Sequence, residues 1–201
     1  MDVQAGSRRK HIEGLPPRGL LFDPAFLSTD EERLLLVELD QLQFREIVIH
    51  GVPARRTARH FGLDYDYEQR VHLEEAEPLP SWLEPLRERC AALAGVQPEA
   101  LVEALVQRYP EGATIGWHRD APSFGLVVGV SLGSGARLRF RRGSKSHWTT
   151  WELDLPPRSA YVLAGEARTT WQHSLPPTKA LRYSITFRTL KPRPSPVATP
   201  G

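Results

Sequence analysis

The chain has 201 residues, 40% of them hydrophobic and 25% charged, and its 26 basic and 24 acidic residues leave a net charge of +2. This composition is typical of one globular domain, and the near-neutral total excludes nucleic-acid binding through bulk charge alone. The single cysteine, Cys90, excludes an internal disulfide framework and a multi-cysteine metal site. No apolar run is long enough to span a membrane or to form an N-terminal signal core, which predicts a cytoplasmic protein.

The two ends of the chain differ in composition from its middle. Residues 1–17 are polar and end in two prolines, which predicts a flexible arm. Residues 191–201 contain four prolines and no apolar periodicity, which predicts an extended, disordered tail. We expect residues 18–190 to form one domain.

Helix signals occur only in the first half of the chain. Ser28 opens a capping-box sequence followed by apolar residues at helical spacing, which predicts a helix over residues 29–42. Ser81 opens a second such sequence and predicts a helix over residues 82–94 that stops at Gly95. Pro85 falls in the first turn of this helix, where proline is tolerated.

After residue 100 the pattern changes to short runs rich in β-branched and aromatic residues, separated by Gly, Pro and Ser. Eight strands are predicted, at residues 104–109, 114–120, 124–132, 136–142, 147–155, 159–167, 168–174 and 181–189. Many short strands at close spacing predict an antiparallel sandwich or barrel of jelly-roll type. With two helices packed on it, the fold class is α+β.

The tripeptide His118-Arg119-Asp120 lies in one of these predicted strands. Period two places the His118 and Asp120 side chains on the same face, and His173 follows several strands later. Two imidazoles and one carboxylate on one face of an octahedral metal ion leave three coordination positions open, an arrangement that suits non-haem Fe(II). Zinc accepts the same ligands, and in the simplest alternative all three residues have ordinary structural roles.

A second pattern lies in the last predicted strand. Arg182 and Arg188 share one face, with Ser184 and Thr186 between them. A guanidinium binds a carboxylate bidentately, so this face is a candidate carboxylate anchor. The two arginines are roughly 20 Å apart along an extended strand, so Arg182 is favoured as the anchor. Solvent-facing arginines are the alternative.

Residues 107–120 resemble the N-x-Y-x-x-G-x-x-I-x-x-H-x-D signature of the AlkB family of Fe(II)/2-oxoglutarate-dependent dioxygenases. His173 and the Arg182…Arg188 pair complete the family pattern in the right order, and the similarity covers roughly residues 18–190. The resemblance implies a double-stranded β-helix (jelly-roll, cupin-like) core with N-terminal helices packed on one sheet. It also implies that His118, Asp120 and His173 hold Fe(II).

The same resemblance implies a site for 2-oxoglutarate. Arg182 would bind its distal carboxylate, and Arg188 occupies the second arginine position of the family. Gln107 stands where the family usually has Asn, so its side chain is longer by one methylene. The residues predicted to bind the co-substrate are Arg182, Arg188, Tyr109, Gln107 and Ser184.

The family places a nucleotide-recognition lid at about residues 44–75 of this chain. The aromatic candidates for contact with a base are Trp117, Phe61, Tyr65 and Tyr67, and the basic candidates for contact with phosphates are Arg55, Arg56 and Arg59. A second basic run, residues 137–145, lies next to Trp148 and Trp151. Core packing of the aromatic residues and solvated strand faces for the basic ones are the alternatives.

The resemblance implies oxidative dealkylation of N-alkylated nucleobases of the 1-methyladenine and 3-methylcytosine type, in DNA and also in RNA. The reaction consumes 2-oxoglutarate and O₂ and releases an aldehyde, succinate and CO₂. We expect a DNA-repair monomer that binds single-stranded or flipped-base DNA and no membrane. The alternatives are a tRNA-modifying AlkB-like hydroxylase or demethylase and a protein-directed dioxygenase or binding module.

Overall fold

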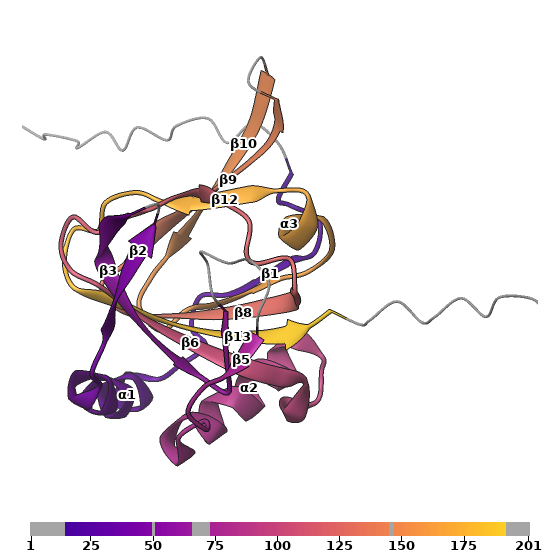
Figure 1. The fold of residues 1–201 in the computed structure, drawn as a ribbon. Coiled ribbons are helices and arrows are strands. Elements are labelled where there is room, and N and C mark those ends of the chain that lie inside the picture. Colours follow the sequence, from indigo (N-terminus) through magenta and orange to yellow (C-terminus); the bar gives the residue numbers. More distant parts are fainter. Residues whose placement is uncertain (1–14, 50, 66–72, 145–146, 192–201) are drawn as a thin grey trace, which may run out of the picture.

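The computed structural model describes residues 15–49, 51–65, 73–144 and 147–191, and two facing sheets form its centre (Figure 1). The larger, seven-stranded sheet has the order β1 (Leu20–Asp23), β11 (Ala160–Leu163), β8 (Phe124–Gly133), β13 (Arg182–Leu190), β6 (Leu101–Tyr109), β3 (Val52–Phe61), β2 (Arg45–Ile49). The smaller, four-stranded sheet has the order β10 (His147–Leu155), β9 (Ala136–Ser144), β12 (Gln172–Leu175), β7 (Ile115–His118). The short strands β4 (Leu63–Tyr65) and β5 (Leu73–Glu75) pair with each other. These antiparallel sheets confirm the predicted jelly-roll, α+β fold.

Two helices cover the outer face of the seven-stranded sheet: α1 (Thr29–Gln41) and α2 (Glu84–Ala94) (Figure 1). Leu39 of α1 and Leu86 of α2 pack in one buried cluster with Val130 of β8 and Ile185 of β13. Of the helices in the described ranges, none has the length and hydropathy needed to cross a lipid bilayer.

The two helix starts differ. Ser28 forms the predicted capping box, in which its hydroxyl accepts from the Glu31 amide and the Glu31 carboxylate accepts from the Ser28 amide. Ser81 makes no side-chain cap; a 3₁₀ turn, η1 (Ser81–Leu83), precedes α2 instead. Because Pro85 has no N–H to donate to the Ser81 carbonyl, the Glu84 amide donates to it and tightens the turn. The capping box predicted at Ser81 is therefore wrong, although the helix still ends at Gly95 in a left-handed conformation.

Eight strands do follow residue 100 in the described part of the chain, but several of their boundaries differ from the prediction; β6, for example, begins at Leu101 and not at residue 104. The strand predicted over 159–167 ends at Leu163, and the chain turns into a short helix, α3 (Gly165–Thr169). The strand predicted over 168–174 begins only at Gln172. The strand that carries His118 ends there, so Asp120 lies just beyond it.

Strand β13 alternates between two environments. Tyr183, Ile185 and Phe187 face the helices and belong to the main core cluster. The residues between them, Arg182, Ser184, Thr186 and Arg188, line a cavity between the two sheets, as the predicted shared face requires. All seven are buried. One strand therefore supplies both the apolar core and the polar lining of the cavity.

Candidate metal centre

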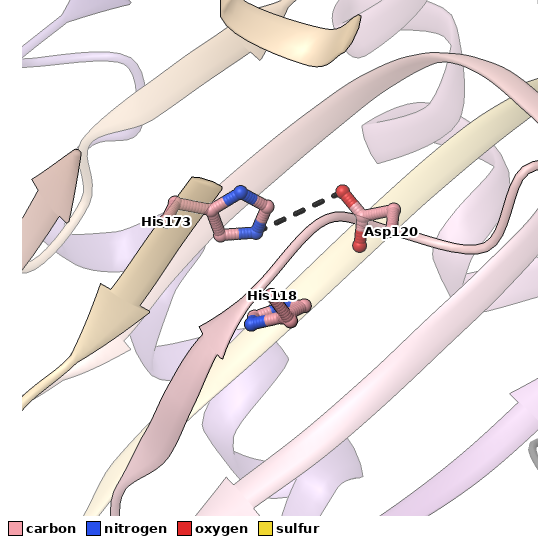
Figure 2. A group of neighbouring side chains, drawn as sticks. All are labelled: His118, Asp120 and His173. Carbon is pink, nitrogen blue, oxygen red and sulfur yellow. Dashed lines mark ion pairs between the residues drawn. The ribbon is translucent and has the colours of Figure 1, made fainter. Parts of the chain in front are cut away.

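His118, Asp120 and His173 meet at one end of the small sheet, and their potential ligand atoms all lie within 4.8 Å of one another (Figure 2). His118 on β7 and His173 on β12 are cross-strand partners, with ring centroids 4.3 Å apart. Asp120 Oδ2 lies 3.8 Å from His173 Nε2. The antiparallel pairing of β7 with β12 thus brings His173, which is distant in sequence, beside His118 and Asp120.

The hydrogen bonds around these residues leave metal-binding atoms available. His118 Nδ1 lies 2.8 Å from the Gly116 carbonyl oxygen and donates to it, which leaves the Nε2 lone pair for a metal. Asp120 Oδ2 is buried and has no hydrogen-bond partner among the described residues. A buried carboxylate oxygen left unpaired beside two imidazoles fits a metal ligand.

Two buried arginines hold Asp120 and the loop that follows it. Arg188 Nη2 lies 3.3 Å from Asp120 Oδ1, and Arg188 Nη1 lies 3.0 Å from Glu103 Oε2 on β6. Arg168 Nη2 donates to the carbonyl oxygens of Ala121 and Phe124 at 2.7 and 2.8 Å. These bonds fix the loop from two sides and leave Oδ2 as the free oxygen of the carboxylate.

The pKa shifts favour the metal-binding protonation states. Burial alone would raise the pKa of Asp120, but the neighbouring positive charge, above all that of Arg188, outweighs it and holds the pKa well below its usual range. Burial, and then the neighbouring His118, lowers the pKa of His173 to about 3. Burial also lowers the pKa of His118. At neutral pH the site therefore presents one carboxylate and two neutral imidazoles.

A cavity of about 800 Å³ adjoins these three residues and is lined by both sheets. Arg182 lies in its wall, is 1% exposed, and donates from Nε to Ser131 Oγ at 3.1 Å. Its Cζ lies 5.1 Å from the Tyr109 ring centroid. Within the described residues no carboxylate lies within ion-pair distance of Arg182, so this buried cation suits an anionic ligand.

The other residues predicted to bind the co-substrate also line this cavity. Tyr109 donates its hydroxyl to Gln107 Oε1 at 2.9 Å, and Ser184 is buried beside Arg182 on β13. Arg188 lines the cavity too, although its guanidinium contacts Glu103 and Asp120.

Strand β3 divides the three arginines that were predicted to contact the substrate. Arg56 lines the cavity, is 8% exposed, and its Nε has no hydrogen-bond partner among the described residues. Arg59 does not line the cavity and forms an ion pair with Glu77. Arg55 is exposed and does not line it either. Only Arg56 is placed to meet a molecule in the cavity.

The aromatic candidates also have different places. Phe61 is 4% exposed in the main core cluster, away from the cavity, so the structure favours its packing role over contact with a base. Trp117 is partly exposed and counts among the residues that line the cavity next to His118, but its ring lies against the Arg139 and Arg141 guanidinium groups on the outer side of the small sheet. Tyr65 ends β4, and Tyr67 lies outside the described residues.

Several site residues were not predicted from the sequence. Glu103 and His60 extend the chain of polar contacts behind Asp120, with His60 Nδ1 3.0 Å from Glu103 Oε1. Tyr161 on β11 lines the cavity, and burial raises its pKa to about 12. A Cβ built at Gly129, its cross-strand partner, would lie 2.3 Å from the Tyr161 ring, so a glycine makes room for this tyrosine. The sequence does contain one indication of a role for Glu103, because it is the single acidic residue in the largely apolar segment 101–109.

Comparison with known proteins identifies the class of enzyme. A family model described as the 2OG-Fe(II) oxygenase superfamily matches residues 20–188. The chain therefore belongs to this superfamily, whose members use Fe(II), 2-oxoglutarate and O₂. Together with the AlkB-like relatives described next, this match confirms the resemblance to the AlkB family seen in the sequence.

Two curated proteins and one solved structure are similar to it. The alkylated DNA repair protein ALKBH8 homolog of Arabidopsis thaliana is 28% identical over 173 residues, covering 75% of this chain and 48% of that protein. The tRNA (carboxymethyluridine(34)-5-O)-methyltransferase ALKBH8 of Macaca fascicularis is 29% identical over 168 residues, covering 78% of this chain and 24% of that protein. The chain thus spans less than half the length of each. The structure of OsALKBH1 shares the fold, with a TM-score of 0.65, 16% identity and coverage of 88% of this chain and 100% of that one.

Proposed function

We propose that this oxygenase removes alkyl groups from the nitrogen atoms of nucleobases of the 1-methyladenine and 3-methylcytosine type, in single-stranded or flipped-base DNA and in RNA. The observation that carries the proposal is Arg56, a second buried guanidinium in the cavity for which the described residues offer no carboxylate. Arg182 suffices for the distal carboxylate of 2-oxoglutarate. Arg56 is then left to meet a substrate that is itself anionic, such as a nucleotide.

The roles of the residues follow from their contacts. His118, Asp120 and His173 would hold Fe(II), which supplies the oxidising chemistry together with 2-oxoglutarate and O₂. Arg182, supported by Ser131 and by Tyr109, Gln107 and Ser184, would orient the co-substrate. Arg188 holds Asp120, and its position in the cavity wall supports a further contact with 2-oxoglutarate.

The remaining space supports a second bound molecule. A cavity of about 800 Å³ is near the upper end of the range for small-ligand sites, and it extends to Ile47 and Val48 on β2. Strands β2 to β5 cover most of residues 45–75, and we assign the nucleotide-recognition lid to this region. On sequence grounds we also propose a monomer that acts in DNA repair in the cytoplasm.

One experiment tests the reaction and the substrate together. The protein is incubated with Fe(II), ascorbate and 2-oxoglutarate and with matched DNA and RNA oligonucleotides or tRNA that carry 1-methyladenine or 3-methylcytosine. Mass spectrometry should show the loss of one methylene, and His118→Ala should abolish it. Succinate release with no mass change in any nucleic acid would overturn the proposed substrate and leave the oxygenase class intact. Loss from tRNA alone would favour the tRNA-directed alternative, which the name of the macaque relative supports.

A further inference from the structure

The outer face of the four-stranded sheet carries side chains that the metal centre does not use. Cross-strand partners share a face, and His173 is paired with Phe140, so both point toward the cavity side. Their neighbours on β9, Arg139 and Arg141, therefore lie on the opposite, outer face. The outer face also carries Arg137, Trp148, Thr150, Glu152, Asp154, Gln172 and Ser174.

Arg141 lies between two tryptophans. Its Cζ is 4.5 Å from the ring centroid of Trp117 on β7 and 4.3 Å from that of Trp148 on β10. Its Nε donates to Gln172 Oε1 at 2.8 Å, which fixes the plane of the guanidinium. Its two terminal nitrogens have no hydrogen-bond partner within the described residues. Both tryptophans are partly exposed.

Arg139 extends the same cluster. Its Nε donates to Ser174 Oγ at 3.2 Å, and its Cζ lies 5.2 Å from the Trp117 ring centroid. In the described parts of the chain, neither Arg139 nor Arg141 has an acidic group within ion-pair distance. We call Trp117, Arg139, Arg141 and Trp148 the Arg–Trp surface.

The next arginine along the strand shows a different arrangement. Arg137 on the same face of β9 bonds from Nε to Asp154 Oδ1 at 2.8 Å and from Nη1 to Glu152 Oε2 at 3.3 Å. Glu152 is the register partner of Arg139, but its carboxylate lies beside Arg137. Positive charge is thus compensated at the Arg137 end of the face and uncompensated at the end that holds the tryptophans.

We propose that the Arg–Trp surface binds the single strand of nucleic acid adjacent to the nucleotide held in the cavity, an inference that rests on the proposed function. Guanidinium edges bind phosphate and indole rings stack on bases, and together they recognise a single strand of any sequence. An acidic protein would engage the arginines and leave the indoles unused. Trp117 directly precedes His118 on β7, the edge strand of the small sheet, so a strand passing around this edge reaches both faces.

Fluorescence anisotropy of a labelled, unmodified oligothymidylate tests the surface without iron or 2-oxoglutarate. Arg141→Ala should raise Kd about tenfold, because it removes a phosphate contact and a stacking partner. The slope of log Kd against log salt concentration should fall by about 0.7. Trp148→Ala should weaken binding with the slope unchanged, because no charge is lost. Arg137→Ala removes the same formal charge from the same strand and face, yet should leave both quantities near those of the wild type.

Equal Kd values for Arg141→Ala and Arg137→Ala would overturn the inference, provided that both variants melt at the wild-type temperature. So would polyglutamate that competes with the oligothymidylate as well as an unlabelled oligothymidylate does, because it would show a general acidic-polymer site. The two proposals fail separately. A wild-type protein that binds through this surface but dealkylates nothing contradicts only the proposed function. An enzyme that dealkylates its substrate but binds oligothymidylate equally well with and without Arg141 contradicts only the proposed role of this surface.

Discussion

Arg188 joins the carboxylate of Asp120, a proposed metal ligand, to the buried carboxylate of Glu103. Its Nη2 lies 3.3 Å from Asp120 Oδ1 and its Nη1 lies 3.0 Å from Glu103 Oε2. Arg188 and Asp120 are both almost fully buried, so their attraction is weakly screened. The pair therefore fixes the orientation of Asp120 before any metal binds.

Replacing Arg188 should weaken metal binding. Arg188→Gln removes the charge that orients Asp120, and loss of such a supporting contact typically lowers metal affinity about 10–100-fold. Titration calorimetry with Mn(II) measures this, with Asp120→Asn as the variant that removes the ligand charge itself. Arg158→Gln breaks a different arginine–glutamate pair, that with Glu32, and should bind Mn(II) normally. Unchanged affinity in Arg188→Gln would show that Asp120 is oriented without it.

Replacing Arg182 should raise KM for 2-oxoglutarate. Truncating one partner of a buried charge pair costs about 2–5 kcal/mol, which corresponds to a KM increase of more than about tenfold for Arg182→Gln. Ser131→Ala keeps the charge and loses only the bond at Nε, so its increase should be smaller. Steady-state kinetics at saturating nucleic acid give both values. An equal effect of the two substitutions would argue against a carboxylate at Arg182.

Arg56 and Arg59 allow a matched comparison on one strand. Arg56→Met should raise KM for the nucleic-acid substrate and leave KM for 2-oxoglutarate near its wild-type value, because Arg56 is the buried cation not needed by the co-substrate. Arg59→Met removes the same charge from the opposite face, where Arg59 pairs with Glu77, and should change neither KM. If Arg56→Met raises KM for 2-oxoglutarate instead, Arg56 belongs to the co-substrate site.

Gly129→Ala should distort the proposed co-substrate site by displacing the Tyr161 ring. The new Cβ would lie 2.3 Å from the Tyr161 ring, so the ring must move within the cavity wall. Overpacking of this kind costs about 1–3 kcal/mol of unfolding free energy, and the moved ring should also raise KM for 2-oxoglutarate. Gly135→Ala, whose Cβ meets its nearest neighbour at an ordinary 3.5 Å, is the control. Urea unfolding and steady-state kinetics measure both quantities for the two variants. Equal unfolding free energies and equal KM values for Gly129→Ala and Gly135→Ala would contradict the need for a glycine beside Tyr161.

The two serines that resemble helix caps should differ in their contribution to stability. Ser28→Ala removes a formed capping box and should lower the free energy of unfolding by about 1 kcal/mol. Ser81→Ala removes no cap and should change it by less than about 0.5 kcal/mol. Urea denaturation measures both, and an equal loss would contradict the 3₁₀ start of α2.

The sequence predicted the second half of the fold better than the first. Strands such as β8 and β10 alternate or are continuously apolar, so periodicity locates them. Strand β3 was not predicted as a strand, because one of its faces lines the cavity and carries Arg56 and His60 where apolar residues would normally occur. Propensity and alternation are weakest where a strand has been adapted to a polar interior.

The sequence also predicted the candidate site in part: it indicated the residues that line the site but not the contacts behind them. His118 and Asp120 are close in sequence, and the family pattern supplied His173 and Arg182. The contacts behind them depend on strand order, which a single sequence does not reveal: Glu103 reaches Arg188 because β6 pairs with β13. Likewise, period two separates Arg56 from Arg59, but only the sheet shows which side of β3 faces the cavity.

The alternation along β13 has an evolutionary consequence. Core residues and the proposed co-substrate residues alternate along one backbone, so a single-residue shift in its pairing would exchange the two sets. We therefore expect insertions and deletions between Arg182 and Arg188 to disrupt both the core and the cavity lining. Substitutions at Ile185 or Phe187 that loosen the helix layer will be selected through catalysis as well as through stability. In this strand, adaptation to temperature and adaptation to substrate cannot proceed independently.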